Sequence, residues 1–466
     1  MHIEKDVCAT LIGTLLDIPG KTKDGVKSRL DLVELNIRSE LAPQVGEKKI
    51  FLPPACYTLS RAEKLSYCKT LSELKVLEGY SSNIQSLMSL KDLKLYGLKS
   101  HDHHVLMQQL LPVAIRGILP KHVRLAIIRL CFFFNAICKK TIDTSQLKGM
   151  QEDVVVTLCL LEKYFPPSFF TIMVHLVVHL VREIEFCGPV HLRWMYPFER
   201  YMKVLKTYVR NRNRPEGCMV ENYIVEEAIE FYSKFIAGVS SIGLNSSVIK
   251  KNSNMDRALS ASSFIRPSKE QLDEAHLYVI QNVNDVLPYV ALALEVPKNS
   301  ITPSLRWIAH GPSPDVATYY GYIINGYYYH TKRRDDIRRV QNRGVSITAT
   351  MMQVSSSKDK NPVMSDMTFY GVIREIWEID YHQLSFILFK CDWVDNRSGV
   401  KVDELGFTIV DLKRIGHKSD SFILATQAKQ VFYVQDSANP EWSVVLTSPQ
   451  RTIEEDFFED EIGDML

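Results

Sequence analysis

The sequence lacks closely spaced cysteines, and it has almost no excess of charge of either sign. Its nine cysteines are scattered singly, and such an odd, dispersed set argues against a disulfide framework and against a zinc ribbon. We therefore expect a reducing, intracellular environment. The formal net charge is only +2, so nucleic-acid binding has to be argued from local clusters of basic residues.

A long apolar run is also missing. The two most apolar segments, 125–138 and 169–181, are shorter than the roughly 20 residues that a membrane span needs, and polar side chains interrupt both. Charged residues among the first ten positions argue against a secretory signal. With 46% hydrophobic and 24% charged residues, the composition is typical of a soluble globular protein.

What the first half does contain is apolar residues at helical spacing, often with a proline near the first turn. Ser60 and Glu63 form a capping-box pattern at the start of one helix. The expected helices are 3–16, 28–41, 60–80, 103–116, 120–138, 145–164, 166–186, 197–210 and 219–237. We interpret segment 238–266, rich in Ser, Asn and Gly, as a linker, followed by a helix over 269–286 and an irregular segment over 301–345.

From residue 367 the period of the apolar pattern changes from about 3.6 to about 2. Six short aromatic and β-branched runs predict a small antiparallel β-barrel or sandwich over 367–447. The final segment, 451–466, is acidic and is expected to be a solvated, disordered tail. The predicted fold class is therefore α+β, with a mainly helical N-terminal half and a small antiparallel β-barrel near the C-terminus.

Three ordered blocks of the sequence resemble the C-terminal portion of plant En/Spm-like (CACTA) transposases. The block that resembles the end of their nuclease region reads MHIEKDVCATLIGTLLDIPGKTKDG. The next block resembles the first of two accessory domains of unknown function, and it runs from HDHHVLMQQLLPVAIRGILPKHVRLAI to YIVEEAIEFYSKF. The third resembles the second accessory domain and includes YIINGYYYHTKRRDDIRRVQNRGV and FYGVIREIWEIDYHQLSFILFKCDWVD.

This resemblance implies a division of the chain. The expected parts are a nuclease remnant at 1–80, a helical accessory domain at 86–240, a linker with one helix at 241–300, a second accessory domain at 301–450 and a tail at 451–466. Some positions depart from the family pattern. Asp6 replaces the usual Asn, and Arg343 replaces Ser in an Asn-Ser-Gly motif, which indicates a truncated or decaying copy.

Transposition by such enzymes resembles other two-metal phosphoryl transfers, in which several carboxylates hold a pair of divalent ions. The resemblance makes Glu4 a weak candidate for the last acidic ligand, and the other acids are expected upstream of Met1. The alternative is an ordinary solvated glutamate, which the helix dipole favours in a first turn. Under either interpretation we expect the catalytic core to be absent, with neither enzymatic activity nor a cofactor.

His175, His179 and Glu183 fall one turn apart on a single helix face, which makes them a weak candidate for a metal site. The pattern lacks the HExxH order of zinc proteases, and the sequence shows no further ligand or supporting shell. A polar stripe hydrogen-bonded inside a helical bundle is the favoured interpretation of these residues.

A basic segment around the predicted helix 197–210 is the best candidate for nucleic-acid binding. Its members are Arg193, Arg200, Lys203, Lys206, Arg210, Arg212 and Arg214. The four basic residues of the helix itself fall within about 120° of one another, and Phe198 and Met202 belong to the apolar set on the other side, so we expect one face to pack and the other to contact DNA phosphates. The alternative is a basic face that is merely solvated.

These observations predict a transposon-derived, transposase-like protein without a complete catalytic core, which binds DNA or helps to assemble a transposition complex. The expected partners are DNA and an intact transposase acting in trans, with no membrane partner, and the expected location is nuclear. The alternatives are a protein-interaction module built on the C-terminal barrel, an enzyme with a metal on the His175/His179 face, and a decayed copy with no function.

Overall fold

The computed structural model describes residues 2–47, 50–78, 84–235, 256–283, 286, 302–353, 363–417 and 420–447. The chain divides into two units. The helical unit comprises residues 1–74, 81–203 and 434–441, and the sheet unit comprises residues 75–80, 204–433 and 442–466.

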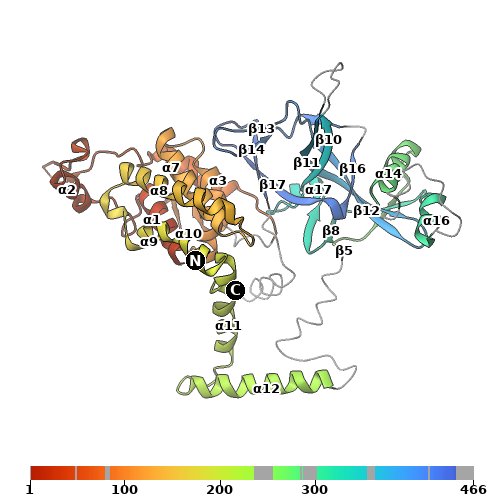
Figure 1. Ribbon diagram of the computed structural model, residues 1–466, viewed down its shortest axis with the longest axis horizontal. Helices are drawn as coiled ribbons and strands as arrows, with labels where there is room; N and C mark the ends of the chain where they lie inside the picture. The colour runs from red at the N-terminus through yellow and green to blue at the C-terminus, as the bar shows by residue number, and fades with distance from the viewer. Residues whose placement is uncertain are drawn as a thin grey trace. The chain divides into compact units, whose positions relative to one another are not determined.

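Helices from the first part of the chain make up most of the helical unit, drawn from red to yellow in Figure 1. They are α1 (His2–Leu15), α2 (Val26–Glu34), α3 (Arg61–Glu73), α4 (Ile84–Leu87), α5 (Ser100–Val105), α6 (Leu111–Ala114), α7 (Lys121–Ile137), α8 (Leu147–Tyr164), α9 (Ile172–Leu176), α10 (Leu180–Cys187) and most of α11 (Tyr196–Thr207). Two short hairpins accompany them, β1 (Gln44–Val45) with β2 (Ile50–Phe51) and β3 (Met88–Ser89) with β4 (Lys94–Leu95). Apolar positions at helical spacing on α1 and α7, such as Leu11 and Ile127, are fully buried. The predicted helical character of this half is confirmed.

Several helices are shorter or less regular than the sequence predicts. The capping box is present, since Glu63 N donates to Ser60 Oγ at 3.3 Å and Ser60 N donates to Glu63 Oε2 at 2.9 Å, but α3 ends at Glu73. The chain leaves α2 through Asn36, which has a left-handed φ of 56°. A π turn (Leu106–Leu110) separates α5 from α6, and a 3₁₀ turn (Val177–His179) separates α9 from α10. Among the described residues, no helix is both long enough and apolar enough to span a membrane.

A buried ion pair attaches segment 434–441 to the rest of the helical unit. Arg116 Nη2 donates to Asp436 Oδ2 at 2.9 Å, and Arg116 Nε donates to Oδ1 at 3.1 Å. The Asp436 side chain is 0% exposed, and Ala438 N adds a further hydrogen bond to its carboxylate at 2.9 Å. Burial raises the pKa of Asp436, but the hydrogen bonds from Arg116 and Ala438 outweigh burial, so the pKa lies below its ordinary value.

Replacing Asp436 with Asn keeps the shape of the side chain but removes the anion that faces the buried Arg116 guanidinium. We expect the free energy of unfolding to fall by about 3 kcal/mol, as is typical when one side of a buried ion pair is removed. Because the folded-state pKa is depressed, this stabilisation is present above the ordinary carboxyl pKa and is lost as pH falls through the folded value. Urea-induced unfolding near neutral pH measures the change.

The matched control is the exposed pair between Arg129 and Asp153, whose side chains lie 2.9 Å apart. Asp153→Asn should cost less than about 1 kcal/mol because solvent screens that pair. Equal costs for Asp436→Asn and Asp153→Asn would contradict the structural importance of the buried pair.

The sheet unit is built on an antiparallel sheet of eleven strands. In the order of the main path these are β13 (Val400–Val402), β14 (Thr408–Val410), β18 (Ser443–Thr447), β17 (Lys429–Gln435), β10 (Gly344–Gln353), β11 (Val363–Asp380), β12 (Ser385–Val394) and β15 (Ile415–Gly416). At its side, β16 (Phe422–Leu424) pairs with β12, β7 (Val316–Tyr319) pairs with β11, and β6 (Ser263–Ile265) pairs with β7. The 18-residue strand β11 is central because it pairs with β10, β12 and β7 (Figure 1).

A smaller sheet and several helices complete this unit. The smaller sheet contains β5 (Arg257–Ala258), β8 (Gly321–Ile324) and β9 (Tyr327–His330). The helices are α12 (Pro215–Phe235), α14 (Lys269–Asn282), α16 (Pro303–His310) and α17 (Lys332–Asp336). The predicted α+β class is therefore confirmed.

The sheet starts earlier than the sequence pattern predicts, and it is not a closed barrel. Strands occur within segment 301–345, interpreted above as irregular, and within segment 238–266, interpreted as a linker. These strands are only two to four residues long, too short to establish an alternating pattern. Among the described strands, β13 and β15 end the path without pairing with each other, so the sheet is open. The acidic segment 451–466 lies outside the described residues.

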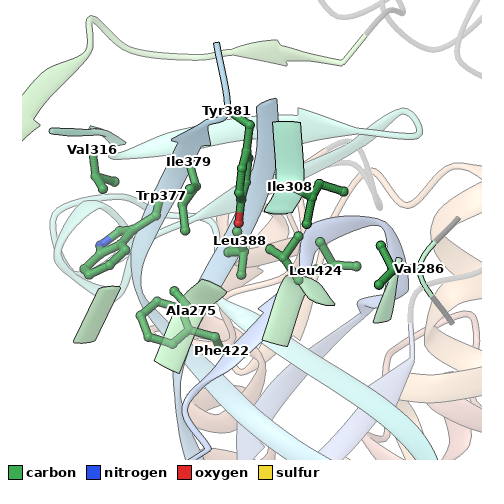
Figure 2. Packing of buried hydrophobic residues seen from close by; sticks show 11 residues of the cluster. Ala275, Val286, Ile308, Val316, Trp377, Ile379, Tyr381, Leu388, Phe422 and Leu424 are labelled. Carbon is green, nitrogen blue, oxygen red and sulfur yellow. The ribbon is translucent and has the colours of Figure 1, made fainter. Parts of the chain in front are cut away.

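A hydrophobic core forms where α14 and α16 pack against the sheet (Figure 2). Trp377 of β11 is fully buried, and its ring centroid lies 4.9 Å from that of Phe422. Ala275 of α14 and Ile308 of α16 belong to the same cluster. Tyr381, at the end of β11, directs its hydroxyl toward His276 of α14, with 2.8 Å between the oxygen and Nδ1. The core thus joins a helix to the longest strand through both apolar and polar contacts.

His276 is expected to make this core sensitive to acid. Burial lowers the pKa of His276, against a smaller opposing effect of Asp273. The unfolded chain therefore takes up a proton first, and stability falls as pH drops through the ordinary histidine pKa of about 6.5. We expect His276→Gln, which cannot titrate, to flatten the dependence of the unfolding free energy on pH in that region. Identical pH profiles for the two proteins in urea unfolding would contradict this.

Candidate functional site

Helices of the helical unit bring a polar group of residues together around Glu4. We call Glu4, His104, Gln108 and Cys138 the Glu4 cluster; they come from α1, α5, the π turn that follows α5, and the C-terminal end of α7. His104 Nδ1 lies 2.8 Å from Glu4 Oε2, and Gln108 Nε2 donates to Glu4 Oε1 at 2.8 Å. One ligand atom each from Glu4, His104 and Cys138 lie within 4.8 Å of one another.

Glu4 is the buried ligand of the cluster, and His104 and Cys138 are half-buried. Glu4 is only 3% exposed, so its interpretation as a solvated first-turn glutamate is wrong. Both carboxylate oxygens have hydrogen-bond partners, which offsets the cost of burying the charge. Burial raises the pKa of the Cys138 thiol well above its ordinary value, and the charge of Glu4 adds to this effect. The indole ring of Trp194 packs edge-on against His104, with 4.9 Å between the ring centroids.

The Glu4 cluster does not fit the pair of magnesium ions that the transposase resemblance implies. Such a pair needs several carboxylates, because magnesium prefers oxygen ligands. Within the described residues, the cluster provides one carboxylate together with a nitrogen and a sulfur ligand. Both oxygens of that carboxylate already have hydrogen-bond partners, His104 and Gln108. The role of Glu4 as a remnant catalytic ligand therefore stays a prediction.

The basic segment runs along α11 and continues into the turn before α12. Because α11 ends at Thr207, the last three arginines lie in this turn and not on the helix. The exposed side chains of the segment are those of Arg193, Lys203, Lys206, Arg210, Arg212 and Arg214. Arg193 lies 4.0 Å from Glu183, whereas the other five form no ion pair within the described part of the chain. The side chain of Arg200 lies outside the described residues.

The apolar face of α11 is less buried than the sequence predicts. Phe198 and Met202 are 63% and 50% exposed, so the expected packing of this part of the helix is wrong. The buried side chain is that of Tyr208, directly after the end of α11, and its hydroxyl donates to the Glu226 carboxylate of α12. Asn222 Nδ2 donates to the Tyr208 carbonyl at 3.4 Å. These contacts fix the turn that carries Arg210, Arg212 and Arg214.

The second predicted site, His175 with His179 and Glu183, is exposed and not part of a buried polar stripe. The Nε2 atoms of the two histidines lie 3.4 Å apart, whereas Glu183 faces Arg193. Among the described residues, this pair gains no third His, Cys or carboxylate ligand. The interior side of this region is apolar and includes Val174 and Val177, which explains why the polar residues face outward.

Sequence reasoning missed a buried polar network in the sheet unit. His330 Nδ1 lies 2.8 Å from Asp335 Oδ1, and Asn342 N donates to Asp335 Oδ2 at 2.6 Å. Glu78 N donates to Asn342 Oδ1 at 3.1 Å, and Lys75 Nζ donates to the Asp335 carbonyl at 3.1 Å. The network therefore attaches segment 75–78 to the sheet unit. Its only signal in the sequence is an acidic residue within KRRDD, a run that is typical of an exposed surface.

Asp335 and its neighbour Asp336 provide a matched test of this network. Asp335 is 1% exposed, whereas Asp336 is more than half exposed and pairs with Arg343 at 2.7 Å. We expect Asp335→Asn to lower the free energy of unfolding by about 2–3 kcal/mol, because buried hydrogen bonds to a charged group are removed. Asp336→Asn should cost less than about 1 kcal/mol. Urea unfolding followed by tryptophan fluorescence measures both changes, and equal effects would contradict the assignment.

Two family models match the chain. The domain of unknown function DUF4218 matches residues 137–247, and the domain of unknown function DUF4216 matches residues 377–445. Both domains are typical of plant transposase-like proteins. The first match includes Cys138 and the whole basic segment, and the second includes most of the main path of the sheet. Neither the curated proteins nor the solved structures include a significant match to this chain.

Proposed function

We propose that this chain is a transposon-derived protein of the En/Spm-like (CACTA) type, which binds DNA through the basic segment and contributes to the assembly of a transposition complex. The observation that carries the proposal is the set of exposed cations without ion-pair partners, among the described residues, from Lys203 to Arg214. The match of DUF4218 across this segment supports it, since that domain is typical of transposase-like proteins. In this proposal the chain acts in the nucleus beside an intact transposase.

The electrostatics favour contact with the phosphate backbone over the reading of bases. Lys203 and Lys206 lie one turn apart on α11, and the arginines of the following turn extend the same run of positive charge. Between residues 193 and 214 the sequence has seven basic residues and a single acidic one, Glu199. Such a segment can displace counterions from several phosphates, which gives affinity and salt dependence but no sequence choice.

The proposal includes no strand cleavage by this chain. Hydrolysis of phosphodiesters by paired metal ions needs carboxylates that bridge the two ions. Among the described residues, the Glu4 cluster offers a single carboxylate, which is insufficient for that chemistry. The chain would therefore contribute binding and assembly, while a complete enzyme performs the cutting.

Reversal of the two exposed helical charges tests the proposal. We expect Lys203→Glu with Lys206→Glu to weaken binding of a fluorescent DNA duplex at least about tenfold, because attraction to phosphates becomes repulsion. The slope of log affinity against log salt concentration should also fall by about 2, one for each phosphate that a lysine no longer neutralises. Fluorescence anisotropy at several salt concentrations measures both quantities.

A second double variant, Lys148→Glu with Lys269→Glu, provides the control. Both lysines are exposed and lie near the starts of other helices, α8 and α14, so the change in net charge is identical. This variant should retain most of the affinity and the salt slope. If the two double variants weaken binding equally, or if Lys203→Glu with Lys206→Glu has no effect, the basic segment is not the binding site.

A further inference from the structure

We propose that the Glu4 cluster binds one zinc ion, with Glu4 Oε2, His104 Nδ1 and Cys138 Sγ as protein ligands. This goes beyond the proposed function, which uses the basic segment and requires no metal. The cluster does not fit a magnesium pair, because an oxygen, a nitrogen and a sulfur atom converge where a nuclease would need carboxylates. This mixed set is characteristic of zinc, whereas magnesium and calcium select oxygen ligands.

The distances require little movement of the protein. In tetrahedral zinc sites the ligand atoms are about 3.5 Å from one another, as follows from metal–ligand bonds of about 2.0–2.3 Å. Glu4 Oε2 and His104 Nδ1 are already 2.8 Å apart, and one ligand atom each from Glu4, His104 and Cys138 lie within 4.8 Å of one another. Adjustments of about 1 Å in side-chain positions would complete the site, with water in the fourth position.

The surroundings of the three ligands favour binding. Gln108 donates to Glu4 Oε1 and so directs Oε2 toward His104, as second-layer hydrogen bonds do in known metal sites. The side chains come from α1, α5 and the end of α7, which are fixed by the helical core. The edge of Trp194 against His104 restricts movement of the imidazole.

Binding would redistribute protons in a defined way. Coordination through Nδ1 requires the neutral His104 tautomer that carries its proton on Nε2, and the ion would then take the place of the contacts of Nδ1 with Glu4 and Gln108. The Cys138 thiol releases its proton to solvent and coordinates as the thiolate. The positive charge of the ion would stabilise two anions, the Glu4 carboxylate and the thiolate.

Cobalt(II) titration of the full chain, freed of metal with a chelator, tests the site directly. Cobalt occupies zinc sites, and a thiolate ligand produces a charge-transfer absorption that oxygen and nitrogen ligands do not. We expect this absorption to saturate at one equivalent of cobalt and to disappear when zinc is added. It should be absent in Cys138→Ser, and Gln108→Met should weaken the affinity about tenfold or more, as is typical for removal of a supporting hydrogen bond.

Two control variants separate this site from other cysteines and histidines. Cys159→Ser changes an exposed thiol on α8, and His175→Ala with His179→Ala removes the exposed histidine pair; both should leave the cobalt spectrum unchanged. Circular dichroism without metal shows whether each variant is folded.

If Cys138→Ser does not fold, Glu4→Gln replaces it and should weaken cobalt binding at least tenfold. Absence of the thiolate absorption in the parent protein, its persistence in folded Cys138→Ser, or unchanged affinity in folded Glu4→Gln would overturn the proposal.

Discussion

The buried ion pair between Arg116 and Asp436 is the constraint on which the organisation of the chain depends. It joins groups 320 residues apart in the sequence and makes segment 434–441 part of the helical unit, although residues 204–433 belong to the sheet unit. Segment 75–80 shows the converse: in the sequence it lies between two parts of the helical unit, but it belongs to the sheet unit. The Asp335 network attaches it there. Neither unit is a continuous stretch of sequence. A cut between residues 203 and 204 would separate the helical unit from segment 434–441 and the sheet unit from segment 75–80.

Local sequence signals predicted the helices well and the strands less completely. Helices form where apolar residues repeat on one face, and the capping box at Ser60 marked the start of α3 correctly. The early strands were missed although Asn325-Gly326 is a strong signal for a two-residue hairpin turn. Both residues have positive φ, 50° and 79°, and they join β8 to β9. The aromatic flanks obscured this signal because YYYH shows no alternation between polar and apolar side chains.

The candidate sites also combine features that the local sequence reveals with features that depend on tertiary contacts. The basic segment is continuous in the sequence, so its charge could be predicted from composition, whereas the exposure of Phe198 depends on contacts that periodicity does not reveal. The family resemblance identified Glu4 but not its partners, because His104 and Cys138 lie 100 and more than 130 positions away. Asp335 was overlooked for a different reason: an acidic residue in a basic run normally faces solvent, and only tertiary packing buries it.

The carboxylate of Glu4 limits which metal ions the Glu4 cluster can bind. A pair of magnesium ions needs several carboxylates, but among the described residues of the cluster Glu4 is the one carboxylate, and Gln108 and His104 contact its two oxygens. A single ion would replace the contact between Glu4 Oε2 and His104 Nδ1 with two metal–ligand bonds, and it would leave the hydrogen bond from Gln108 to Oε1 in place. A single ion with nitrogen and sulfur ligands fits that restriction. It would fasten α1 to α5 and α7 and leave contact with DNA to the basic segment.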